Sequence, residues 1–231
     1  MDLNVEGLSS WYGQAQVLWN IDMVAREGEV IGILGRNGAG KTTLLRAIAG
    51  LHSKSSGAVK LGGQDMVRRT THDIARAGVA FLREAGQLPK SLSVTQNLLL
   101  GQRLARSRGK SPRTLEEIWE WFPLLQPLAD RKTELLSGGQ RQALALAMAF
   151  ASRPSLMLLD EPSAGLAPLI ARDLYTAIRN LAADGLTVVV VEQHPAWLTG
   201  LVNRCYLLET GRVTDEGSLD ALLGRKQSEL L

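Results

Sequence analysis

The segment from Gly35 to Thr42 constrains this chain more than any other. It has the sequence Gly-Arg-Asn-Gly-Ala-Gly-Lys-Thr, which matches the pattern G-x-x-x-x-G-K-[ST]. The apolar run 30–34 precedes it, and the helix-forming stretch 43–49 follows. Glycines allow the tight turn that directs successive backbone N–H groups into one concavity, and a helix start adds partial positive charge. This order of strand, loop and helix predicts a site for phosphate groups.

The residues of this loop are expected to divide the contacts with a nucleotide. Lys41 can reach the outer phosphates as a point charge, and the hydroxyl of Thr42 can bind Mg²⁺. A Gly-rich turn followed by an ordinary helix is the alternative, which the flanking elements disfavour. We expect nucleotide contacts from Gly35, Arg36, Asn37, Gly38, Ala39, Gly40, Lys41, Thr42 and Thr43.

A second segment, Leu156 to Glu161, ends an apolar run with adjacent carboxylates. The uninterrupted run predicts a strand buried in a parallel sheet. Successive side chains of an extended chain point in opposite directions, so the two carboxylates can perform different tasks. We assign Asp160 to Mg²⁺ and Glu161 to the catalytic base that deprotonates water. Two solvated carboxylates at a strand end are the alternative.

A third segment precedes the long helical run 141–151. Its residues are Ser137, Gly138, Gly139 and Gln140. Ser137 suits a helix N-cap, and the glycines leave the first N–H groups of the helix unobstructed. The pattern predicts a second anion site, although alone it fits an ordinary capped core helix equally well.

Together, and in this order and spacing, the three motifs resemble those of ATP-binding cassette (ABC) ATPases. The run from Leu136 to Gln140 is similar to the signature sequence of that family, and the resemblance extends over roughly residues 3–223. It implies that Ser137, Gly138, Gly139 and Gln140 of one subunit close on the γ-phosphate bound by the phosphate loop of another. A homodimer, or a heterodimer with a second ABC ATPase subunit, is therefore implied.

Smaller motifs extend the resemblance. Tyr12 stands where the family places an aromatic side chain that stacks on adenine, and Glu84 stands where many members carry the glutamine of their Q-loop. The resemblance adds Glu84 to the metal site. Residues 160–168 and 191–193 are similar to the ATPase subunits of bacterial branched-chain amino-acid importers.

The resemblance implies an ATPase that uses ATP and Mg²⁺ and energises a membrane ABC transporter, with import of branched-chain or related amino acids as the expected task. It further implies integral membrane permease subunits as partners and no direct contact with the transported substrate. The alternatives are the ATPase of another ABC system, for lipids or amides, and a soluble regulatory ABC ATPase without a permease.

Three positions depart from the family pattern. Ala167 replaces an aspartate that most members carry, and residues 82–87 lack the expected Pro-Glu-Gly pattern. Gln193 occupies the position of the usual switch histidine, with His194 one residue later. Both are candidates for the catalytic γ-phosphate sensor. We favour Gln193, because it has the family register and because Pro195 biases His194 towards an extended exit from the site.

Composition and charge narrow the class of protein. The net charge of +3 is too small for the footprint of a nucleic-acid-binding protein, so no nucleic-acid partner is expected. A basic cluster within 103–113 predicts an exposed loop, either solvated or in contact with anionic lipid.

The N-terminus lacks a signal pattern, and the apolar runs are shorter than the about 18 residues that span a bilayer. We expect a cytoplasmic location, peripheral on the inner face of the membrane. Cys205 predicts a buried thiol.

The predicted fold class is α/β: a P-loop ATPase core with a parallel sheet, an antiparallel β subdomain and an inserted helical subdomain. Apolar runs predict parallel strands at 79–82, 156–160 and 187–192, and an antiparallel piece at 4–8, 17–24, 30–34 and 58–61. Helical patterns cover 94–104, 115–122 and 137–151. We expect a single domain over 1–231, with its core at 1–86 and 154–223. The helical lobe is predicted at about 87–153, and a frayed tail at 224–231.

Overall fold

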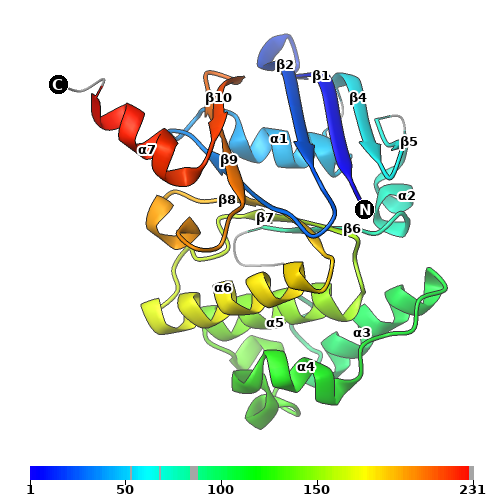
Figure 1. Cartoon of the computed structure of the whole chain (residues 1–231). Coiled ribbons are helices and arrows are strands. Elements are labelled where there is room, and N and C mark those ends of the chain that lie inside the picture. Colours follow the sequence, from blue (N-terminus) through cyan, green and yellow to red (C-terminus); the bar gives the residue numbers. More distant parts are fainter. Residues whose placement is uncertain (53, 68, 84–87, 229–231) are drawn as a thin grey trace.

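The structure, a computed structural model, describes residues 1–52, 54–67, 69–83 and 88–228, with only the backbone described at 225–228. Its strands form two sheets, and α1 lies between them (Figure 1). Helices α3, α4, α5 and α6 gather on the other side of the larger sheet (Figure 1). None of the described helices combines the length and apolarity required to cross a membrane.

The larger sheet has the strand order β10-β9-β3-β8-β7-β6. All neighbouring strands are parallel except β9 and β10, which form an antiparallel hairpin. Every residue of β3, β7 and β8 is buried, as expected for strands that are covered on both faces. The bounds are β3 Val30–Leu34, β6 Val79–Leu82, β7 Leu156–Asp160, β8 Thr187–Val191, β9 Arg204–Glu209 and β10 Arg212–Gly217.

The smaller sheet is antiparallel, in the order β2-β1-β4-β5. Its strands are β1 Leu3–Tyr12, β2 Ala15–Ala25, β4 Ser55–Leu61 and β5 Gln64–Asp65. The predicted strands at 4–8, 17–24 and 58–61 are confirmed here. The assignment of 30–34 to this antiparallel piece is wrong, because β3 pairs in parallel with β8 and β9. Its uninterrupted apolar run suits a central strand that has no solvent-exposed face.

The helices agree with the predicted periodicity, apart from the C-terminal one. The α-helices are α1 Lys41–Ile48, α2 Thr71–Arg76, α3 Val94–Ser107, α4 Leu115–Trp121, α5 Gly138–Ala151, α6 Pro168–Ala183 and α7 Leu219–Ser228; short 3₁₀ turns are η1 Pro123–Leu128, η2 Thr133–Leu135 and η3 Pro195–Leu198. The expected frayed tail from 224 is wrong as far as Ser228, since α7 continues through it.

Alternate residues of the central strands feed two apolar cores. Met157 and Leu159 of β7 pack with the helical side of the molecule, whereas Leu158 packs with α1 and the antiparallel sheet. On the helical side, the aromatic residues of α4 join this core. The ring centroid of Trp121 lies 5.4 Å from that of Phe150, and the ring centroid of Phe122 lies 6.2 Å from it. These aromatic residues therefore contribute to core packing.

The predicted exposed basic loop at 103–113 is wrong for residues 103–107, which are helical, although Arg103, Arg106 and Lys110 are exposed as expected. Arg103 and Arg106 belong to α3, because no helix-breaking residue occurs before Gly109. Beyond the helix, Arg108 donates to the carbonyl of Ser152 and Lys110 to that of Arg153, at 2.9 and 3.0 Å. Carbonyls at the end of a helix attract cations, so this segment is anchored to the end of α5.

Cys205 is fully buried, as predicted, and burial raises the pKa of its thiol to about 11. It pairs in register with Gly32 of β3. A Cβ atom at Gly32 would lie 2.7 Å from Cys205 Sγ, with Leu198 and Val202 next nearest. The central strand therefore requires glycine because the neighbouring strand fills the space.

We predict that Gly32→Ala destabilises the fold by about 1–3 kcal/mol, the usual cost of overpacking. The cost should be smaller in a Cys205→Ala background, because the displaced sulfur is then absent. Urea unfolding of wild type, both single variants and the double variant measures this coupling. Strictly additive effects would contradict the proposed contact.

Candidate functional site

Three loops meet at the carboxyl edge of the larger sheet, where β3, β8 and β7 end side by side. A cleft of about 290 Å³ lies there. It is lined by Val17, Asn37, Gly38, Gly40, Lys41, Thr42, Thr43 and Glu161. The structure therefore brings the predicted phosphate loop and one of the two predicted carboxylates to a common cavity.

The loop is held tightly against its surroundings. Gly40 has φ +104°, a conformation that favours glycine, and its carbonyl accepts from Leu44 N–H within the first turn of α1. A Cβ atom at Gly35 would lie 2.3 Å from the carbonyl oxygen of Leu208. Gly211, in the turn between β9 and β10, donates its N–H to Ala39 O at 2.9 Å. The hairpin thus buttresses the loop.

Lys41 is buried at the centre of the loop, with 6% of its surface exposed. Its Nζ donates to Gly35 O at 2.9 Å and to Arg36 O at 3.1 Å. Burial lowers the pKa of Lys41, while Glu161 and Asp160 oppose that shift. The ammonium group is therefore held where two carboxylates and the loop carbonyls attract it.

Asp160 contacts the loop from the end of β7. Thr42 Oγ1 donates to Asp160 Oδ1 at 3.1 Å. Burial raises the pKa of Asp160, the bond from Thr42 opposes the shift, and the charge of Glu161 adds to it. A hydroxyl and a carboxylate are hard oxygen ligands, and Mg²⁺ in nucleotide sites binds one or two protein oxygens together with phosphates. This pair fits Mg²⁺.

Glu161 faces a different partner. Gln193 Nε2 donates to its two carboxylate oxygens at 2.9 and 2.8 Å. Glu161 lies just beyond β7 and has φ +49°, uncommon for a non-glycine residue. Simple strand alternation was expected to separate Asp160 from Glu161. The separation instead involves this left-handed backbone, which the hydrogen bond from Glu161 N–H to Val191 O supports at 3.0 Å.

His194 does not join this contact. Its side chain is exposed, and no hydrogen bond links it to Glu161 in the described part of the chain. The residue precedes η3, and its carbonyl accepts from Trp197 N–H at 3.1 Å. The geometry brings Gln193, and not His194, to the predicted catalytic base.

Tyr12 lies at the end of β1 with 48% of its surface exposed. Its ring meets that of His52 edge-on, with the centroids 4.5 Å apart, and its hydroxyl accepts from Arg46 Nη1 at 3.3 Å. Arg46 belongs to α1, so Tyr12 is attached to the helix that follows the phosphate loop. It does not line the cleft.

The signature segment lies away from the cleft, in the helical part of the chain. Ser137 caps α5, and Gln140 completes a capping box, with Gln140 N–H bonded to Ser137 Oγ and Ser137 N–H to Gln140 Oε1. Ser137 and Gly138 are exposed, whereas Gly139 packs against Ile170. None of these residues lines the cleft of their own chain. Glu84, the other predicted metal residue, lies outside the described residues.

Sequence reasoning missed Glu192. This carboxylate is only 3% exposed and accepts hydrogen bonds from Tyr175 OH and, at 3.1 Å, from Ser163 N–H. Burial raises the pKa of Tyr175, and the Glu192 charge adds to the shift. A carboxylate at the end of an otherwise apolar buried run is a usable signal, because a buried charge requires partners. Glu192 directly precedes Gln193 in the chain, and its bond from Ser163 N–H joins it to the loop after Glu161.

Comparison with known proteins identifies the family. Residues 18–164 match the family described as ABC transporter. The chain is 34% identical over 221 residues to the high-affinity branched-chain amino acid transport ATP-binding protein BraG of Pseudomonas aeruginosa, covering 96% of this chain and 94% of that protein. It is 32% identical over 225 residues to the probable branched-chain amino acid transport ATP-binding protein LivF of Archaeoglobus fulgidus, covering 97% and 95%.

Proteins with other names are also similar. The sulfate/thiosulfate import ATP-binding protein CysA of Methylococcus capsulatus is 37% identical over 227 residues, covering 95% of this chain and 64% of that protein. Among solved structures, the ADP conformation of an ATP-binding cassette of an ABC transporter superposes with a TM-score of 0.84 at 26% identity, covering 98% of this chain and 96% of that one. The predicted α/β P-loop fold and the predicted family are confirmed. The chain belongs to the ABC transporter family, as one of its ATP-binding, ATP-hydrolysing cassettes.

Proposed function

We propose that the cleft binds ATP with Mg²⁺ and that Glu161 and Gln193 act together on the water that attacks the γ-phosphate. The observation that carries this proposal is the paired hydrogen bond from Gln193 Nε2 to both carboxylate oxygens of Glu161, beside the phosphate loop. A carboxylate held by an amide is oriented without losing its ability to accept a proton.

Lys41 and the loop N–H groups hold the β- and γ-phosphates in this mechanism. Lys41 exchanges its bonds to the carbonyls of Gly35 and Arg36 for phosphate oxygens. Thr42 and Asp160 would hold Mg²⁺, which neutralises charge on the phosphates when bound. Glu161 accepts the proton of the attacking water, and Gln193 gives up one of its two bonds to Glu161 to donate towards the γ-phosphate. Tyr12 stacks on adenine, and Glu84 stays a predicted metal neighbour.

A second copy, or a second ABC ATPase subunit, completes the site. The exposed Ser137 and Gly138 at the start of α5 carry open N–H groups, yet they do not line the cleft of their own chain. When two chains close on each other, Ser137 and Gly138 of one chain reach the nucleotide in the cleft of the other. The free energy for closure comes from tighter binding of ATP to the closed state than to the open one.

The proposed physiological role is to energise import through integral permease subunits at the cytoplasmic face of the membrane. Two similar proteins named for branched-chain amino-acid transport support this substrate class. A similar protein named for sulfate import favours a different substrate. The decisive assay is purification of the tagged chain with its permease from detergent-solubilised membranes, followed by ATP-dependent leucine uptake in proteoliposomes. Uptake of sulfate instead, or no membrane partner, would overturn the assignment.

Asp160→Asn should stabilise the nucleotide-free protein and therefore raise its Tm. The pKa of Asp160 is raised on folding, so its ionised form weakens the folded state once pH exceeds the unfolded-state pKa of about 3.9. Asparagine keeps the acceptor for Thr42 without the charge. Hydrolysis should nevertheless be lost with the Mg²⁺ ligand. Thermal unfolding at neutral pH, with exposed Asp173→Asn as control, would refute this if Tm fell or stayed constant.

Glu161→Gln should reduce ATP hydrolysis by a factor on the order of 10² or more while ATP still binds, because the amide cannot accept a proton. Because ATP is then not hydrolysed, the closed dimer should accumulate. Turnover assays and size-exclusion with ATP·Mg²⁺ or ADP measure both effects, and exposed Glu120→Gln is the matched control. A variant that stays monomeric with either nucleotide would argue against the closing dimer.

Gln193→Ala should reduce turnover more strongly than His194→Ala, because only the Gln193 side chain contacts Glu161. Loss of one charge-assisted contact corresponds to roughly 10-fold to 100-fold in rate. Steady-state ATP turnover of the two single variants decides between them. Full activity of Gln193→Ala combined with an inactive His194→Ala would reverse the assignment and make the histidine the sensor.

A further inference from the structure

A second, larger cavity of about 840 Å³ lies at the amino-terminal edge of the parallel strands, opposite the nucleotide cleft. Ser155 and Leu186, which immediately precede β7 and β8, line it. The two cavities share no lining residue. Because a strand rises about 3.3 Å per residue, the length of β7 separates them by about 15 Å. A ligand could therefore occupy this cavity while a nucleotide occupies the other.

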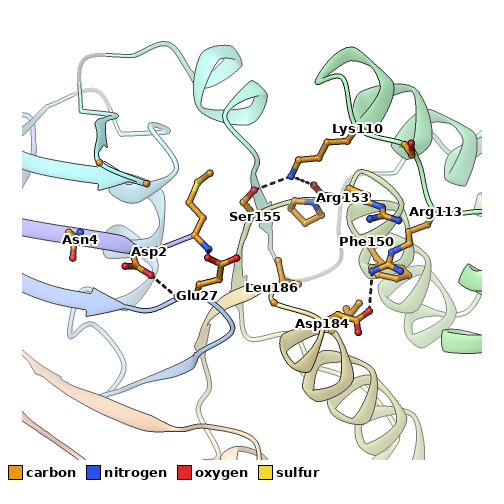
Figure 2. Close-up of a pocket in the computed structure, with 17 residues that line it drawn as sticks. Asp2, Asn4, Glu27, Lys110, Arg113, Phe150, Arg153, Ser155, Asp184 and Leu186 are labelled. Carbon is orange, nitrogen blue, oxygen red and sulfur yellow. Dashed lines mark hydrogen bonds and ion pairs between the residues drawn. The ribbon is translucent and has the colours of Figure 1, made fainter.

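Two chemically different walls face each other across the cavity, as Figure 2 shows. Lys110, Arg113 and Arg153 stand on the wall formed by the helical side of the molecule (Figure 2). Asp2 and Glu27 stand on the wall formed by the β1 and β2 side (Figure 2). The amino group of Met1 also lines the cavity and lies 3.0 Å from Glu27 Oε2, so the acidic side is partly compensated. Segments far apart in the sequence thus build one concave site with a cationic and a partly neutralised acidic side.

The cationic wall has a surplus of positive charge. Of its cations, Arg113 is the one paired with a carboxylate that lines the cavity: its Nη2 lies 3.1 Å from Asp184 Oδ2. Lys110 donates to Arg153 O and Ser155 Oγ, which are neutral acceptors. Among the described residues, Nε of the Arg153 guanidinium has no acceptor, although the charge of Arg153 acts on Glu117. Arg113 is also paired with Glu117 Oε1 at 3.4 Å, so three cations against the carboxylates of Asp184 and Glu117 leave one positive charge in excess on this wall.

Unused hydrogen-bond donors point to the same conclusion. Within the described residues, the buried donors without an acceptor include Nε of Arg113 and Nε of Arg153, both of which line the cavity. Burial lowers the pKa of Lys110, and repulsion from Arg108 and Arg153 lowers it further. Native proteins rarely leave several buried donors unsatisfied in one cluster unless an acceptor binds there.

Anchoring of the end of α5 explains only part of this cluster. Arg108 and Lys110 donate to carbonyls at that helix end, which accounts for their position. It does not account for Nε of Arg153, which has no acceptor among the described residues, or for the third N–H donor of Lys110. Lys110 and Arg153 both line the cavity, so this remaining capacity belongs to its wall.

We propose that this cavity binds a small phosphate-bearing anion, with the phosphate on Arg153, Lys110 and Arg113 and with hydrogen-bond donors at the other end of the ligand facing Asp2 and Glu27. Arginine and lysine together are the usual protein ligands of phosphate. The volume suits a small molecule, and the enclosure between two walls disfavours a flat membrane surface. A bound ligand joins the helical wall to the β-sheet wall.

Titration with inorganic pyrophosphate tests the proposal. The measurement uses a Lys41→Ala background, because the phosphate loop also binds phosphates, and calorimetry reports the remaining site. Arg153→Gln and Lys110→Gln should each weaken this binding on the order of 10-fold to 100-fold, as for the loss of a charged hydrogen bond. Arg103→Gln removes an exposed cation of α3 outside the cavity and should leave the affinity unchanged.

Two further variants and one further probe complete the test. Arg153→Lys retains the charge and should keep most of the affinity, and Arg153→Gln should fold with an unchanged Tm because, among the described residues, Nε of Arg153 has no acceptor to lose. Absence of pyrophosphate binding, or equal binding by Arg153→Gln, Lys110→Gln and Arg103→Gln, would overturn the site. Sedimentation with phosphatidylglycerol vesicles tests whether a lipid surface is the ligand instead. If vesicle binding depends on Arg153 and pyrophosphate does not bind, the proposed small-molecule site is wrong and the cavity faces lipid.

Discussion

The parallel pairing of β3, β8 and β7 is the constraint on which the rest of the molecule depends. Their register aligns Val30 with Val188 and Leu156 with Thr187, so the three strands end at one edge of the sheet. The loops that follow them carry Lys41, Glu161 and Gln193. These strands are buried on both faces, so a one-residue slip would disturb both apolar cores. Burial of the apolar strands therefore fixes the relative positions of Lys41, Glu161 and Gln193, although these polar side chains contribute little to the apolar cores.

The strands bring the loops that carry Glu161 and Gln193 to one edge of the sheet, and a buried polar network fixes these loops relative to each other. Glu192 accepts from Tyr175 OH on α6 and from Ser163 N–H in the loop after β7. It thereby holds together the two segments that present Glu161 and Gln193. The backbone of Glu161, at φ +49°, is uncommon for a side chain of this kind. Such a conformation persists when surrounding contacts determine it, and here the bond to Val191 O and the Glu192 network supply them.

The two edges of the larger sheet carry clusters of opposite charge: carboxylates at the carboxyl edge and cations at the amino edge. At the carboxyl edge, burial raises the pKa of Asp160 and the charge of Glu161 adds to the shift, although Lys41 lies close to both carboxylates. At the amino edge, burial lowers the pKa of Lys110, and repulsion from Arg108 and Arg153 adds to the shift. A group of opposite charge that binds at either edge would offset these charges. A cation with a nucleotide suits the first edge, and an anion suits the second.

Local patterns in the sequence determined the elements and the chemistry of individual residues. The loop from Gly35 to Thr42, the carboxylates after β7 and the cap at Ser137 depend on neighbours within a few residues, so propensity and periodicity were sufficient to predict them. Tertiary structure alone decided that β3 joins the parallel sheet, that Gln193 meets Glu161, and that Arg153 and Asp2 face one cavity. Those contacts join residues that lie far apart in the chain, and a sequence does not state which distant surfaces minimise exposed apolar area together.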